Sequence, residues 1–189
     1  YLMRISEMLS VDDFIPITFD EKELFDKHYE KYPPIHSDNV FTTLISWMEY
    51  ADYHFAYINE NLIIYSNIKN KIRFRPPSGK FNKNIFDQVL KLAKEQDTGH
   101  PIGVIDEETK NRMSKEYPSL IFDEDRDYFD YIYLTDDLVN LSGSNYSKIR
   151  NRLNKFKKNH EYSVEEITEE NMNEVREFLK RWCLWRDCE

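Results

Sequence analysis

Three apolar segments between residues 53 and 75 constrain the fold more than any other feature of this sequence. Residues 53–58 and 62–68 are rich in β-branched and aromatic side chains, and the polar triplet Asn59-Glu60-Asn61 separates them. This arrangement is typical of a β-hairpin. Residues 72–75 predict a third strand, which Pro76-Pro77 ends. The sequence therefore predicts a strand meander.

Helical patterns flank the meander on both sides. Asp20 with Glu23 begins one helix, which Pro33-Pro34 stops, and Ser37 is placed to cap a second. The elements expected after the meander are a helix over 85–93, a strand over 102–105, a helix that Asp106 caps, strands over 120–122 and 128–134, a helix over 144–159, a strand over 162–167 and a helix opened by Thr168. This order predicts an α/β fold with a mixed sheet, not a doubly wound dinucleotide-binding fold.

The composition is that of a folded chain with a charged surface. At 189 residues, with 40% hydrophobic and 32% charged side chains, it suits one full domain and part of another. The longest aliphatic stretch, residues 62–64, is far shorter than the ~18–20 residues of a membrane span. Cys183 and Cys188 cannot form a disulfide framework, so reduced thiols are expected. We expect a cytoplasmic protein without a membrane span.

The sequence lacks the motifs that hold common cofactors. Its four glycines are isolated, which excludes a phosphate loop, a dinucleotide loop and the glycine-rich turn that normally holds coenzyme A. The five histidines have no metal-ligand spacing, and no G-x-S-x-G elbow is present. We expect the acidic run over 123–127 to form a solvated turn. No cofactor, no metal and no catalytic residue is predicted.

A basic segment stands out against an acidic chain whose net charge is −9. Between residues 138 and 160 there is no acidic residue, while six Lys and Arg side chains occur on the predicted helix. The candidate contact residues are Lys148, Arg150, Asn151, Arg152, Lys155 and Lys158. Tyr146, Ile149, Leu153 and Phe156 share the opposite, apolar face, which we expect to dock on the body of the protein. The basic face could follow a phosphate backbone, or it could dock an acidic second domain.

Three segments carry a resemblance to a known family. They are Tyr32-Pro33-Pro34 through Phe41-Thr42 to Trp47; Glu124-Asp125-Arg126-Asp127 through Phe129-Asp130-Tyr131-Ile132-Tyr133-Leu134-Thr135; and Lys148-Ile149-Arg150-Asn151-Arg152-Leu153-Asn154-Lys155-Phe156. With these segments the chain resembles bacterial and archaeal proteins of unknown function that are related to the C-terminal part of phosphatidylglycerol lysyltransferases. The resemblance extends over essentially all 189 residues.

The resemblance implies two tandem acetyltransferase-like (GNAT) domains. Residues 1–141 would form the first, residues 142–160 a basic bridging helix, and residues 161–189 the first strand and helix of an incomplete second domain. It also implies a relation to enzymes that move an amino acid from aminoacyl-tRNA to a lipid or other acceptor. In those enzymes the pocket depends on the second domain, so this chain alone is expected to be inactive.

Three hypotheses for function follow. In the first, the chain is the non-catalytic half of a tRNA-dependent aminoacyltransferase or acyltransferase, and its partners are a second acetyltransferase-like domain and tRNA. In the second, it is an interaction module whose basic helix is a structural strut. The third is acetyl-CoA-dependent acetylation, which the absence of a glycine-rich turn disfavours. No oligomeric state is predicted.

Overall fold

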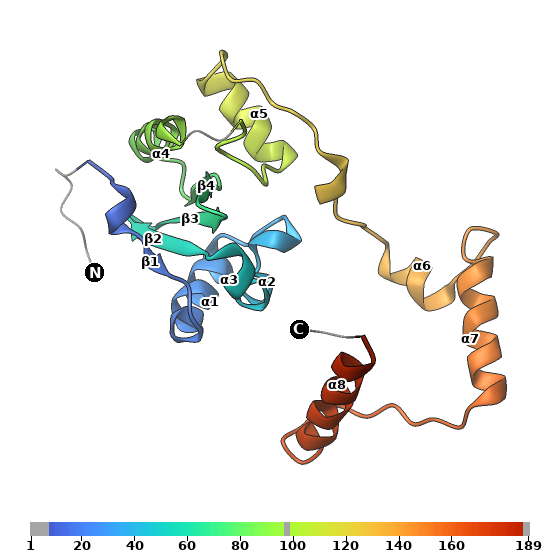
Figure 1. Ribbon diagram of the computed structural model, residues 1–189. Helices are drawn as coiled ribbons and strands as arrows, with labels where there is room; N and C mark the ends of the chain where they lie inside the picture. The colour runs from blue at the N-terminus through green and yellow to red at the C-terminus, as the bar shows by residue number, and fades with distance from the viewer. Residues whose placement is uncertain (1–7, 97–98, 187–189) are drawn as a thin grey trace. The chain divides into compact units, whose positions relative to one another are not determined.

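A computed structural model describes residues 8–96 and 99–186 of the chain (Figure 1). The chain forms two compact units, Tyr1–Tyr131 and Ile132–Glu189, and each is described by itself. The first unit contains the sheet and five α-helices, and the second contains three α-helices among the described residues. The described structure is thus a mixture of helices and antiparallel strands.

The sheet of the first unit is a meander in the order β1-β2-β3-β4, with β5 also paired to β3. Its strands are β1 (Ile15–Pro16), β2 (His54–Ile58), β3 (Asn61–Ile68), β4 (Lys71–Phe74) and β5 (Ser78–Gly79). All of these pairs are antiparallel. The hairpin and the third strand that the sequence predicts are therefore confirmed.

Two tight turns set the register of the meander. Asn59 and Glu60 connect β2 to β3 with φ values of 49° and 60°, and Lys69 and Asn70 connect β3 to β4 with values of 53° and 62°. Two consecutive left-handed residues match the right-handed twist of the adjoining strands. As a result, Phe55 pairs with Ile64 and Tyr65 pairs with Phe74.

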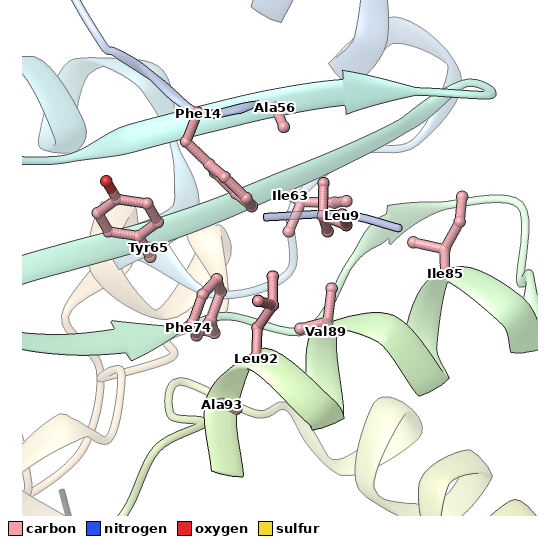
Figure 2. Packing of buried hydrophobic residues seen from close by; sticks show 10 residues of the cluster. All are labelled: Leu9, Phe14, Ala56, Ile63, Tyr65, Phe74, Ile85, Val89, Leu92 and Ala93. Atoms are coloured by element: carbon pink, nitrogen blue, oxygen red, sulfur yellow. The ribbon is translucent and has the colours of Figure 1, made fainter. Parts of the chain in front are cut away.

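Helices cover both faces of the sheet (Figure 1). On one face α4 (Lys83–Glu95) packs on a cluster that includes Phe14, Ile63, Tyr65 and Phe74, as Figure 2 shows. On the other face, α1 (Lys22–Lys31), α2 (Phe41–Ser46) and α3 (Met48–Ala51) contribute to a second cluster. Strand β3 is buried on both sides, which explains its unbroken apolar run.

The helix boundaries follow the capping residues. Thr18 makes a capping box with Glu21 ahead of α1, Asn82 caps α4, and Asp106 caps α5 (Glu107–Glu116) as predicted. Ser37 does not cap α2, because it begins the 3₁₀ turn Ser37–Asn39 that the His36 side chain caps. That turn directly precedes α2 and holds the chain close to the sheet.

Several predicted strands are absent from the described structure. Residues 120–122, 128–134 and 162–167 form no strand, and 102–105 contribute only a parallel bridge between Ile102 and Phe74. A 3₁₀ turn, Arg126–Tyr128, occupies part of 128–134 instead. An apolar composition favours a strand, but a strand forms only where a neighbour completes its hydrogen-bond ladder. The expectations for 120–122, 128–134 and 162–167 were wrong for that reason, while 102–105 pairs with Phe74 through a single bridge.

The second unit contains α6 (Thr135–Asn140), α7 (Ser147–Asn159) and α8 (Met172–Arg186). The predicted basic helix therefore begins three residues later than Ser144, and the last helix begins four residues after Thr168. Thr168 instead donates its backbone N–H to the Asn171 side chain. Cys183 lies half-buried on α8, and Cys188 lies outside the described residues.

Candidate functional site

The basic helix α7 presents most of its predicted contact residues to solvent. Lys148, Asn151, Arg152, Lys155 and Lys158 are all exposed. Among the described residues of the second unit, none of the four cations in this set forms an ion pair. The α7 sequence itself contains no acidic side chain. The helix can therefore offer several uncompensated positive charges to an anionic surface.

Arg150 has a different environment from the other candidates. Its Nη1 donates to the backbone oxygen of Gly143 at 2.6 Å and to that of Leu141. Leu141 ends α6 in the left-handed conformation, so the arginine fastens the connection between α6 and α7. Arg150 is half-buried and acts on the fold of the second unit.

Within the second unit, the apolar face of α7 is only partly covered. Ile149, Leu153 and Phe156 remain 42–47% exposed, although the Phe156 ring lies 5.3 Å from that of Tyr162. On α8, Trp182 is 44% exposed and Trp185 is 76% exposed. Within the second unit, both helices therefore retain exposed apolar surface.

In the first unit, the residues around Ser37 and Asp130 join two of the segments that carry the family resemblance. The Ser37 backbone N–H and hydroxyl each donate to the Asp130 carboxylate. His36 Nε2 lies 2.7 Å from the Tyr128 backbone oxygen, and its Nδ1 accepts from the Asp38 N–H. The two hydrogen bonds from Ser37 hold the pKa of Asp130 below its usual value, with a smaller contribution from His36.

Two arginines that the sequence analysis did not single out lie near this contact. Arg75 is 7% exposed and donates to the Asp38 backbone oxygen, the Asn39 side chain and, at 3.1 Å, the Tyr53 hydroxyl. Burial lowers its pKa from the usual value. Arg73 lies with its guanidinium 5.8 Å from the centre of the Tyr128 ring. The sequence pattern that could have identified these two residues is a pair of arginines at alternate positions of the predicted strand over 72–75, which is otherwise apolar.

Two further features are absent from the described residues. No group of three His, Cys, Asp or Glu side chains within residues 8–96 and 99–186 is arranged to hold a metal ion. Over the same ranges, no helix combines the length and the apolar character that crossing a bilayer requires.

The sheet with helices on both faces, followed by an exposed basic helix, defines a mixed α/β protein with an electropositive element. The chain belongs to the family described as phosphatidylglycerol lysyltransferase, C-terminal, whose model matches residues 29–189. This confirms the family resemblance found in the sequence.

Among solved structures, the chain is similar to a conserved protein of unknown function from Bacteroides thetaiotaomicron VPI-5482. The TM-score is 0.75 at 26% sequence identity, and the match covers 93% of this chain. It covers 60% of the other chain, so this chain corresponds to less than two thirds of that relative's length. No curated protein matches the chain.

Proposed function

We propose that this chain is the non-catalytic half of a tandem acetyltransferase-like protein related to the tRNA-dependent aminoacyltransferases. In this proposal α7 contacts tRNA phosphates, and a second acetyltransferase-like domain supplies the chemistry. Residues 1–141 form the first domain, 142–160 the bridging helix, and 161–189 the start of the second. The two cysteines, which the sequence predicts to be reduced, favour a cytoplasmic location, where the partner would be tRNA.

The exposed cations of α7 are the observation that carries this proposal. Lys148, Arg152 and Lys155 have no ion-pair partner among the described residues of the second unit, and no acidic residue lies on their helix. Each phosphate that such a side chain neutralises releases condensed counterions, so binding falls steeply as salt rises. Membership of a lysyltransferase-related family supports an RNA partner for these charges.

A titration of this chain with tRNA at two salt concentrations tests the proposal. Changing Lys148, Arg152 and Lys155 together to Ala is expected to weaken binding and to flatten the plot of log affinity against log salt by about two units, at ~0.7 per phosphate. The matched control changes the exposed Lys69, Lys94 and Lys110 to Ala, which removes the same charge outside α7. If the chain binds no tRNA at either salt concentration, the proposal that α7 contacts tRNA phosphates is wrong.

The uncovered apolar surface of α7 and α8 favours a second candidate function. In that candidate α7 is a strut that docks another domain, and the chain has no enzymatic role. The same triple change would then leave RNA binding absent or unaltered. It would lower the melting temperature of a longer protein that includes the second domain, and leave that of this chain unchanged.

A further inference from the structure

Two guanidinium groups lie on one side of the sheet at the end of β4. Side chains alternate across a strand, so Arg73 and Arg75 point to the same face while Phe74 between them points into the α4 cluster. Arg75 follows the last residue of β4, and its N–H continues the ladder by donating to the Ile64 oxygen at 2.8 Å. The fold therefore places both side chains on the same face, two residues apart.

Neither arginine forms an ion pair among the described residues. Burial lowers the pKa of Arg75, and the Tyr53 and Asp38 side chains oppose that shift through space. No carboxylate oxygen lies within 4.0 Å of either guanidinium in that part of the chain. The three described bonds of Arg75 go to neutral oxygens and use three of its five N–H groups. The Arg73 Nε is buried and has no hydrogen-bond partner. Since buried charges are normally paired, a buried arginine without an ion pair, two residues from a second arginine without one, is unusual.

The surroundings of the two arginines are rigid and aromatic. The Arg75 guanidinium lies 5.0 Å from the centre of the Tyr53 ring, and that of Arg73 lies over Tyr128. A Cβ atom added at Gly103 would come within 2.4 Å of the Arg73 Nε, so the chain passes directly against this guanidinium. Tyr128 is held in turn through its backbone oxygen by His36. The two cations are thus pre-positioned by packing.

We propose that Arg73 and Arg75 form a binding site for an oxyanion, either a carboxylate or a phosphate group. Guanidinium groups present parallel N–H donors that match the oxygen pairs of both groups. The bound anion would form the close ion pair that neither guanidinium makes among the described residues. This site lies in the first unit, and it does not depend on RNA binding by α7.

Thermal unfolding of the chain in phosphate, acetate and chloride at matched ionic strength tests the site. At least one of the two oxyanions is expected to raise the melting temperature above that in chloride, in a saturable manner. A response to phosphate alone assigns a phosphate group, and a response to acetate assigns a carboxylate. Arg73→Gln is expected to weaken the apparent affinity at least tenfold, and it is preferred because Arg73 is half-buried and Arg75 supports the core.

The matched control is Lys69→Gln, which removes one exposed charge at the turn before β4. It is expected to change the affinity by less than about twofold, because exposed charges act only through screened long-range attraction. The proposal is wrong if neither oxyanion stabilises the chain beyond chloride. It is equally wrong if the two variants weaken binding to the same extent.

Chemical labelling gives a second measurement on the unmodified chain. Phenylglyoxal reacts with arginine side chains, and mass spectrometry can follow Arg73 and the exposed Arg126 separately. The stabilising oxyanion is expected to slow labelling of Arg73 at least threefold and to leave Arg126 unchanged. Equal labelling of Arg73 with and without the anion would overturn the proposal.

Discussion

The backbone N–H of Ser37 donates a 2.9 Å hydrogen bond to the carboxylate of Asp130, a residue 93 positions away in the sequence. The Ser37 hydroxyl donates to the other carboxylate oxygen. In the same turn, the Asp38 backbone oxygen accepts a hydrogen bond from Arg75. The last residues of the first unit are thereby fastened to the turn that precedes α2.

Replacing Asp130 by Asn is expected to loosen residues 128–131. Hydrogen bonds to a charged acceptor at a solvent-accessible site are worth about 1 kcal/mol, so chymotrypsin should cut after Phe129 and Tyr131 about fivefold faster. Because Ser37 lowers the pKa of Asp130, this stabilisation is present above the usual value of 3.8 and is lost as pH falls through the lowered folded-state value. Asp127→Asn is the control, and equal cleavage of the two variants would contradict the assignment.

The buried imidazole of His28 is expected to make stability depend on pH. His28 is 3% exposed, its Nε2 lies 3.0 Å from the Ser78 hydroxyl, and its Nδ1 has no described partner. Burial lowers its pKa below the usual 6.5, with a further contribution from Lys31. The unfolded chain therefore binds the proton more readily, so the free energy of unfolding should fall as pH drops below 6.5.

Urea unfolding at pH 7 and pH 5 measures this effect. His28→Gln keeps a polar side chain beside Ser78 but cannot take up a proton, so the difference between the two pH values should shrink. His100→Gln removes an exposed imidazole and serves as the matched control. An unchanged pH difference in the His28 variant would show that another group causes it.

Arg150 is expected to matter for folding of the second unit more than for RNA. Arg150→Ala removes the donors to the Leu141 and Gly143 oxygens, and a half-buried charged hydrogen bond is worth about 1.5 kcal/mol. Amide exchange over 141–147 should then become roughly tenfold faster. Lys148→Ala, two residues away and exposed, should leave this exchange unchanged. Equal exchange in both variants would refute the bracing role.

Gly79 is expected to tolerate no side chain. Its φ is +139°, and an added Cβ would lie 2.4 Å from the Glu60 backbone oxygen. Gly79→Ala should therefore cost about 2 kcal/mol or more in the free energy of unfolding, as measured by urea denaturation. Gly99→Ala is the control, because no atom lies within 4 Å of an added Cβ there. A similar, small cost at both positions would contradict the close approach.

Local chemistry was enough to predict the meander and several helices. The runs in β2 and β3, the Asp106 cap of α5 and the Pro33-Pro34 stop after α1 each act over a few residues. The basic character of α7 was equally visible, because a charge run needs no partner to be recognised. The family itself was recognisable from three short segments.

Contacts between distant residues decided the rest. Residues 128–134 are rich in aromatic and aliphatic side chains, as strands are, yet they form none, because a ladder needs a neighbouring strand that local sequence does not specify. The burial of Arg75 and His28 and the hydrogen bond between Ser37 and Asp130 could not be predicted for the same reason, because each depends on residues that are distant in the sequence. The sequence by itself determined which segments could become helices or strands and where the positive charge lies. Only the tertiary structure decided which segments pair in the sheet and which polar groups are buried. Strand pairing and burial both depend on neighbours that folding brings together.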